Sequence, residues 1–133
     1  MPFLKLKTKK PLSVGARGEM VAENYLKKIG YTVLARNFTN SSGRRLGEID
    51  IIATDNAEIV FVEVKTRISN YDDQILPEEN ITKAKLYKLN KIASFYINKN
   101  KLFDVSYRFD AITIIANTKT STAKIRHIKN IFI

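Results

Sequence analysis

Residues 47–67 read GEIDIIATDNAEIVFVEVKTR, and this stretch decides the fold. Its two runs of branched and aromatic residues are typical of strands, and the turn-forming TDNA between them predicts an antiparallel hairpin. We expect strands over residues 46–53 and 58–67, joined by a loop of four or five residues. Four ionisable residues interrupt the apolar runs, and they form either a solvated surface or a site: Glu48, Asp50, Glu63 and Lys65.

The alternation of side chains along a strand predicts which of these residues meet. Glu48 and Asp50 are expected on one face of the first strand, with the isoleucines that follow each of them on the other face. The same rule places Glu63 and Lys65 together on one face of the second strand. If the two strands pair in the right register, all four charges gather on a common face, whereas a slip of one residue separates them.

Carboxylates that lie close together in a protein have few possible functions. Their mutual repulsion either raises a pKa or recruits a hard divalent cation such as Mg²⁺. Magnesium promotes the attack of water on phosphorus, and a nearby lysine can hold or deprotonate that water and offset charge in the transition state. In the competing interpretation, the four residues make ordinary cross-strand salt bridges on a half-exposed hairpin. The spacing alone leaves both interpretations open.

The flanking sequence predicts the remaining elements. Apolar residues recur with helical spacing before Gly30, so we expect a helix from Ser13 or Gly15 to Gly30, and residues 31–39 then read as a strand. Thr82 can cap a second helix that ends at about Asn98, and residues 107–116 and 124–133 read as two further strands. This order predicts an α/β domain over residues 15–133, with one mixed sheet of about five strands flanked by helices, after a flexible basic arm over residues 1–14.

Composition narrows the class of protein. The 133 residues, 44% of them hydrophobic, suit one domain, and the absence of cysteine excludes disulfides, thiolate zinc sites and cysteine nucleophiles. The sequence contains no apolar run of eighteen residues and no recognisable signal peptide, which predicts a soluble cytoplasmic protein without a membrane partner. A net charge of +10 favours nucleic acid as the partner, although a basic surface kept for solubility is the alternative.

Five segments together carry a resemblance to known proteins, and they cover most of residues 15–115: GARGEMVAENYLKKIGYTVLARN (15–37), GEIDIIA (47–53), IVFVEVKTR (59–67), ITKAKLYKL (81–89) and RFDAI (108–112). Their order resembles the PD-(D/E)xK nuclease superfamily. More closely, it resembles the YraN family of small uncharacterised bacterial proteins, which is related in fold to archaeal Holliday-junction resolvases.

The resemblance has functional implications. It implies a restriction-endonuclease-like core and Mg²⁺- or Mn²⁺-dependent hydrolysis of DNA, including branched or structured DNA, and a homodimer is one assembly it suggests. The alternative is a nucleic-acid-binding module of nuclease ancestry that does not cut.

The resemblance also implies roles for individual residues. Asp50 and Glu63 match the metal-binding carboxylates, the backbone carbonyl of Val64 is a further ligand, and Lys65 matches the catalytic lysine. Glu19 resembles the helix carboxylate that completes the metal site in resolvase-like members; alternatively, it is a surface acid that favours the helix dipole.

Other residues have more open assignments. Three roles are open for Glu48: it binds a second metal ion, it contacts the metal ligands without binding the metal, or it is only a hydrogen-bond partner. The superfamily's proline before its first aspartate is absent, since Ile49 precedes Asp50. We expect His127 to be structural, and for Asp110 a salt bridge with Arg108 is the one role that the sequence offers. Nucleic-acid contacts are expected from six basic residues, for which a solvated surface is the alternative: Lys83, Lys85, Lys88, Arg67, Arg44 and Arg45.

Overall fold

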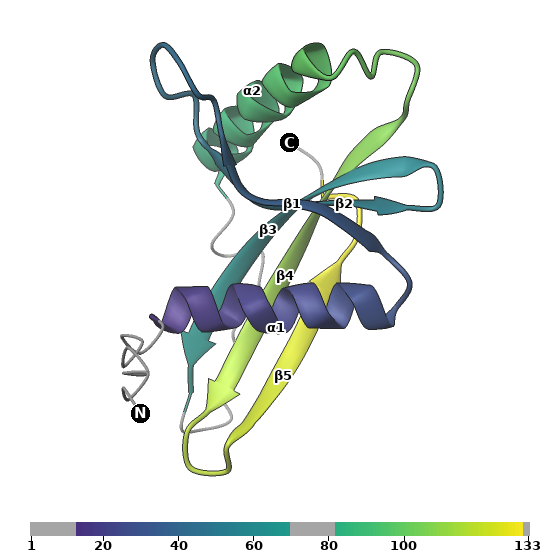
Figure 1. Cartoon of the computed structure of the whole chain (residues 1–133). Coiled ribbons are helices and arrows are strands. Elements are labelled where there is room, and N and C mark those ends of the chain that lie inside the picture. Colours follow the sequence, from purple (N-terminus) through teal and green to yellow (C-terminus); the bar gives the residue numbers. More distant parts are fainter. Residues whose placement is uncertain (1–12, 70–81, 132–133) are drawn as a thin grey trace, which may run out of the picture.

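The computed structural model describes residues 13–69 and 82–131 (Figure 1). Five strands form one mixed sheet in the order β1-β2-β3-β4-β5. Only β3 and β4 are parallel, and the other neighbours are antiparallel. The elements are α1 (Val14–Lys28), β1 (Thr32–Thr39), β2 (Glu48–Asp55), β3 (Glu58–Ile68), α2 (Lys83–Lys99), β4 (Tyr107–Asn117) and β5 (Thr122–Ile128). The predicted α/β domain with about five strands flanked by helices is confirmed.

Polar side chains set the start of each helix. The Ser13 hydroxyl accepts a hydrogen bond from the Ala16 N–H, and the Thr82 hydroxyl accepts one from the Lys85 N–H, both at 3.1 Å. Each bond satisfies a backbone donor that has no partner inside its helix. Helix α1 therefore begins at the end of the predicted basic arm, whose residues 1–12 lie outside the described part of the chain.

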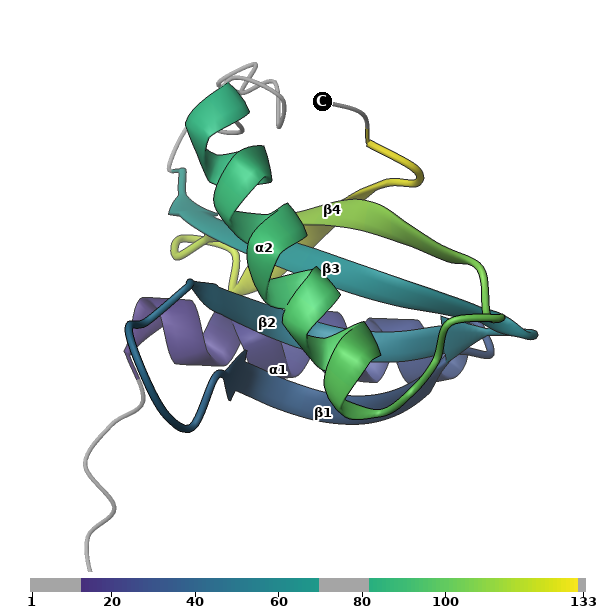
Figure 2. The same ribbon diagram turned by 90° about the horizontal axis from the view of Figure 1, so that it is seen from above.

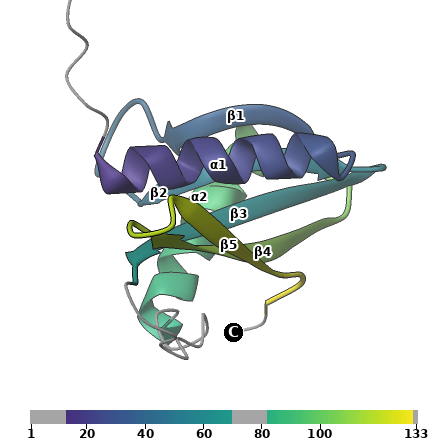
Figure 3. The same ribbon diagram turned by 90° about the horizontal axis from the view of Figure 1, so that it is seen from below.

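The two helices cover opposite faces of the sheet (Figures 2 and 3). Ala22 and Leu26 of α1 pack with Val60 and Val62 in one core layer, which we call the α1 layer. The α2 layer on the other face contains Leu86, Leu89, Ile92 and Ala93 of α2, packed with Ile59 and Phe61. Because β3 is buried on both faces, its sequence runs IVFV without polar interruption, as expected for a central strand with a parallel neighbour.

The turn between β2 and β3 is shorter than the sequence predicts. Thr54 and Asp55 pair with Ile59 and Glu58, so only Asn56 and Ala57 connect the strands, and the predicted loop of four or five residues is wrong. Asn56 has φ +56°, a left-handed conformation that asparagine tolerates and that two-residue hairpin turns favour. The turn residues therefore extend the hairpin instead of interrupting it.

Helix α1 approaches β3 most closely at Gly18. A Cβ atom at this position would overlap the Thr66 hydroxyl and lie 2.8 Å from Thr66 Cβ, which is closer than real contacts of this kind. Glu19 is the next residue on α1. The contact between Gly18 and Thr66 therefore fixes how close Glu19 comes to the sheet.

We expect Gly18→Ala to lower the free energy of unfolding by about 1–3 kcal/mol, because the added methyl group forces α1 away from β3. The matched control is Gly15→Ala, three residues earlier on the same helix, where an added Cβ meets no atom within 4 Å. That change should instead stabilise the protein by up to about 1 kcal/mol through helix propensity. Urea unfolding of both variants measures the difference, and equal effects would contradict the close contact.

Candidate functional site

Strands β2 and β3 separate in the middle of the sheet. They pair from Asp55 and Glu58 as far as Ile51 and Val62, after which β2 continues beside β1 and β3 continues beside β4. Just past the last pair, Asp50 Oδ2 accepts a hydrogen bond from the Val64 N–H at 2.8 Å. At this point the Asp50 side chain, and not the backbone of a paired strand, accepts the hydrogen bond from Val64. We call this point the strand fork, formed by Asp50 on β2 and residues 63–65 on β3.

The alternation of faces breaks at Asp50. Ile51 packs in the α1 layer, but Ile49, two residues earlier, packs in the α2 layer. The expectation that both isoleucines share a face is therefore wrong. Across the β1–β2 ladder, Arg36 pairs with Ile51 and Phe38 pairs with Ile49, which leaves Asn37 between them with φ +51°. A left-handed residue inside a strand turns the following side chain to the other face, so the distortion of β1 accompanies the distortion of β2.

Four acids lie at or next to the fork: Glu19 of α1, Glu48 and Asp50 of β2, and Glu63 of β3. We call them the carboxylate cluster. Burial, and then the negative charges of Glu63, Glu19 and Glu48, raise the pKa of Asp50 to about 7, against the opposing hydrogen bond from Val64. Burial likewise raises the pKa of Glu19, with Glu48 and Glu63 adding to the effect. The neighbouring acids are therefore close enough to disfavour the ionisation of Asp50 and Glu19.

The members of the cluster differ in their partners. Asp50 makes no ion pair with any basic side chain in residues 13–69 and 82–131. Each of the other three acids has a basic partner. Lys85 of α2 lies 3.0 Å from Glu63. Arg45 of the β1–β2 loop lies 3.5 Å from Glu48, and Arg36 of β1 lies 3.9 Å from Glu19. Among the described residues, the acid with the most strongly raised pKa is thus the one that lacks a basic partner.

The structure brings only some of the predicted residues to the fork. Lys65 follows Glu63 by two residues and lies on the same face of β3, and Lys85 and Arg45 join the cluster through their ion pairs. The Val64 N–H donates to Asp50, and the role of the Val64 carbonyl as a metal ligand stays a prediction. Of the other predicted nucleic-acid contacts, Lys83, Lys88 and Arg44 are exposed, and Arg67 is half-buried on β3.

The chemistry of the cluster suits a hard cation, since all of its side-chain donors are carboxylate oxygens. Within the described part of the chain, however, no three Asp, Glu or His side chains stand in the arrangement of a metal site. Glu63 and Glu48 are instead engaged by Lys85 and Arg45. The metal ligands Asp50, Glu63, Val64 and Glu48 therefore stay a prediction.

Sequence reasoning overlooked Asn37. With its amide nitrogen facing the acids, Asn37 donates hydrogen bonds to Glu19 at 2.8 Å and to Glu48 at 3.2 Å. Asparagine is disfavoured in strands, and its presence in the run TVLARNFT is a signal that β1 is distorted here. The sequence shows that local irregularity but not the two acids that Asn37 contacts.

A second polar network lies at the turn end of the β2–β3 hairpin. Arg108 contacts Asp110 at 2.9 Å, Glu58 at 2.7 Å and Asp55 at 3.1 Å. Asp110 is fully buried and lies 2.7 Å from His127 Nε2. The predicted salt bridge between Arg108 and Asp110 is confirmed, and the contacts of His127 are those of a structural residue.

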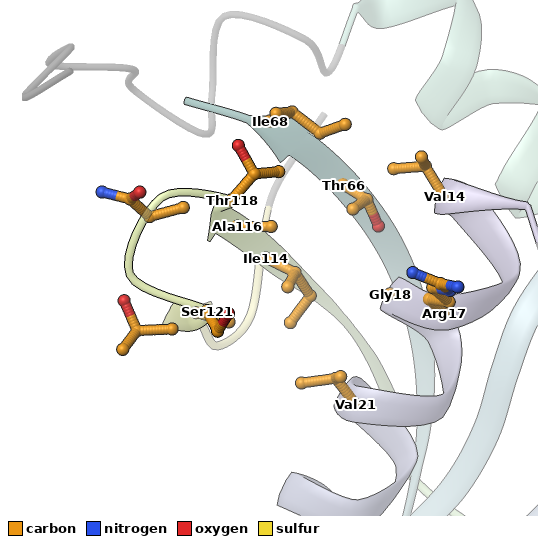
Figure 4. A pocket seen from close by; sticks show the side chains of 13 residues that line it. Val14, Arg17, Gly18, Val21, Thr66, Ile68, Ile114, Ala116, Thr118 and Ser121 are labelled. Carbon is orange, nitrogen blue, oxygen red and sulfur yellow. The ribbon is translucent and has the colours of Figure 1, made fainter. Parts of the chain in front are cut away.

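A pocket of about 440 Å³ lies on the α1 side of β3 (Figure 4). Val14, Gly18 and Val21 of α1 form one wall, and Ile114 of β4 contributes to the apolar floor. Thr66 lines the pocket, while its chain neighbour Lys65 lies on the opposite face of the strand. No member of the carboxylate cluster lines this pocket.

Comparison with known proteins assigns the chain to a family. The model of "Uncharacterised protein family UPF0102" matches residues 18–114, a span that contains the carboxylate cluster and Lys65. The chain belongs to this family. Membership of UPF0102 confirms the resemblance to the YraN family drawn from the sequence.

Several bacterial UPF0102 proteins are similar over most of their length. One from Clostridium tetani is 46% identical over 119 residues, and one from Clostridium kluyveri is 43% identical over 119 residues. A third, from Clostridium botulinum, is 45% identical over 120 residues. Each alignment covers 90% of this chain and 93% of the relative. In the described part of this UPF0102 chain, neither helix has the length and apolar character needed to cross a membrane.

Proposed function

We propose that this UPF0102 protein is a cytoplasmic, Mg²⁺- or Mn²⁺-dependent endonuclease that hydrolyses phosphodiester bonds in DNA, built on a restriction-endonuclease-like core. One observation carries the proposal: Asp50, mostly buried at the strand fork, has three acids around it and no basic partner among the described residues. An acidic site of this kind inside a protein of net charge +10 suits a cation that is shared with a polyanion.

The residues at the fork have distinct roles in this proposal. Asp50 and Glu63, with the Val64 carbonyl, would hold the cation, and Glu19 and Glu48 would add negative charge around it. When bound, the cation supplies positive charge that polarises a phosphodiester and acidifies water. Lys65 provides an ammonium group on the same face as Glu63, where it would hold the attacking water and offset charge in the transition state.

Basic side chains near the fork supply the proposed contacts with DNA. Lys83 and Lys88 are exposed on α2, and Arg44 and Arg45 are exposed in the β1–β2 loop. Such side chains attract phosphate without reading sequence. This charge distribution supports binding of nucleic acid, and a preference for structured or branched DNA and assembly as a homodimer stay predictions.

Lys65→Met tests the reaction. We expect the wild type to cut single-stranded, duplex or junction DNA only when Mg²⁺ or Mn²⁺ is present, and we expect Lys65→Met to slow cleavage by about 100-fold or more. The matched control is Lys99→Met, an exposed lysine in the last turn of α2, which should cut at the wild-type rate. Matching RNA substrates in the same assay identify the nucleic acid. Cleavage by Lys65→Met at the wild-type rate would sink the proposed mechanism.

The second candidate function is a nucleic-acid-binding module that does not cut. The ion pair between Lys85 and Glu63 favours it, because a lysine 3.0 Å from a predicted ligand competes with a metal for that carboxylate. This function predicts no cleavage with either metal and an affinity for DNA that falls steeply as salt concentration rises. Weak, salt-insensitive binding without cleavage would reject both functions.

A further inference from the structure

Asn37 occupies a special position on the backbone. It lies in the middle of an edge strand with φ +51°, between the paired residues Arg36 and Phe38. The β1–β2 register places it across from Asp50, the residue at the centre of the carboxylate cluster. A left-handed backbone here directs the side chain away from the regular alternation of the strand. Because asparagine tolerates this conformation better than most residues, the position admits few alternatives.

The side chain of Asn37 joins two acids from different elements. Carboxylates only accept, so the amide is oriented with its nitrogen toward them, and in this orientation it donates to Glu19 Oε1 on α1 at 2.8 Å and to Glu48 Oε1 on β2 at 3.2 Å. An amide NH₂ group has two hydrogens, and an ionised carboxylate only accepts, so one asparagine satisfies both acids at once. The hydrogen bond also favours the ionised form of Glu19, because it opposes the effect of burial on the pKa of that residue.

The neutrality of the asparagine amide matters for a metal site. Lysine or arginine in this position would hold the two acids together but would cancel the negative charge that attracts a cation. An amide links them and leaves the total charge unchanged. Arg36, the neighbouring cation, is farther from Glu19, at 3.9 Å.

We propose that Asn37 is a positioning residue that holds the helix carboxylate Glu19 and the strand carboxylate Glu48 at the rim of the fork, so that both face a divalent cation bound at Asp50. This inference rests on the proposed function, since it requires a cation at the fork. It assigns Asn37 no contact with the substrate or with the metal. Residues that orient metal ligands in this way typically account for a 10- to 100-fold difference in metal affinity.

Asn37→Gly tests the inference, because glycine accepts the left-handed backbone and lacks the amide. We expect the dissociation constant for Mn²⁺, measured by calorimetry without DNA, to rise about 10- to 100-fold. The control is Asn56→Gly, which makes the same change at the left-handed residue of the β2–β3 turn, where φ is +56°. Asn56→Gly should change Mn²⁺ affinity less than twofold. Asn37→Ser, with one donor instead of two, should give an intermediate loss.

A double variant identifies the route of the effect. If Asn37 acts through Glu19, the loss caused by Asn37→Gly should be at least about threefold smaller in a Glu19→Gln background, since the two residues are then coupled. An unchanged loss in that background, or wild-type Mn²⁺ affinity in Asn37→Gly, would overturn the role given to Asn37 and leave the proposed function standing. A wild type that binds no Mn²⁺ would overturn both.

Discussion

Replacing Asp50 with asparagine should abolish metal-dependent cleavage and, at the same time, stabilise the metal-free protein at pH 8. The carboxylate at this position is mostly buried and surrounded by three acids, so its ionisation in the folded state is unfavourable. Asparagine keeps an oxygen that can accept the Val64 N–H and removes the charge. We expect the free energy of unfolding in EDTA to rise by about 1–3 kcal/mol at pH 8.

The pH dependence of stability follows from the direction in which folding shifts the pKa of Asp50. The pKa of Asp50 is about 7 in the folded protein, against an ordinary value of 3.8. Between these two values the folded state holds a proton that the unfolded state has lost, so the stability of the wild type falls as pH rises from about 4 to about 7. The advantage of Asp50→Asn should therefore be near zero at pH 4 and complete at pH 8.

Urea unfolding in EDTA at several pH values measures this effect. The control is Asp104→Asn, at an exposed position in the segment between α2 and β4, for which a change below about 0.5 kcal/mol is expected at every pH. Added Mn²⁺ should then stabilise the wild type and leave Asp50→Asn unchanged. A pH-independent difference between wild type and Asp50→Asn would show that neither burial nor the charges of the cluster raise the pKa of Asp50.

The elements of the fold could be predicted because each is specified locally. The start of each helix follows from Ser13 or Thr82, which cap their own helices, and β3 follows from a run of apolar residues that a parallel neighbour requires. The β2–β3 turn was harder to predict. Thr54 and Asp55 resemble turn residues by composition, and only their pairing with Ile59 and Glu58 shows that they belong to β2.

The arrangement of the fork could be predicted only in part. Alternation along β3 correctly places Glu63 and Lys65 on one face, because β3 is regular there. Alternation along β2 fails at Asp50, where the facing position on β1 is the left-handed Asn37. The burial of Asp50 and the approach of Glu19 to the fork depend on how α1 packs against β3 at Gly18. These are long-range effects that spacing along the chain does not contain.

Arg108→Met should cause the largest loss of stability among these changes, about 3–5 kcal/mol at pH 7. The Arg108 side chain is only 12% exposed and contacts three acids, the fully buried Asp110 among them. Methionine fills a similar volume but leaves the Asp110 carboxylate without its guanidinium. Urea unfolding measures the loss, and Arg44→Met, at an exposed arginine, is the control, with an expected change below about 0.5 kcal/mol.

The acid sensitivity of this variant should also change. Burial by itself would raise the pKa of Asp110, but hydrogen bonds from His127, Arg108 and the Asn130 N–H outweigh it and hold the pKa below its ordinary value. A carboxyl with a lowered pKa contributes stability above its ordinary pKa and loses that contribution as pH falls through the folded value. Without Arg108 the pKa of Asp110 rises, so Arg108→Met should begin to unfold at a higher pH than the wild type.

Mn²⁺ affinity separates this network from the fork. Arg108 and Asp110 lie at the turn end of the hairpin, and β2 and β3 part from each other at its opposite end. At a temperature where Arg108→Met is still folded, its Mn²⁺ affinity should equal that of the wild type, although its free energy of unfolding is far lower. A variant of normal stability that binds Mn²⁺ weakly would contradict a structural role and would make the network of Arg108, Asp110 and His127 part of the metal site.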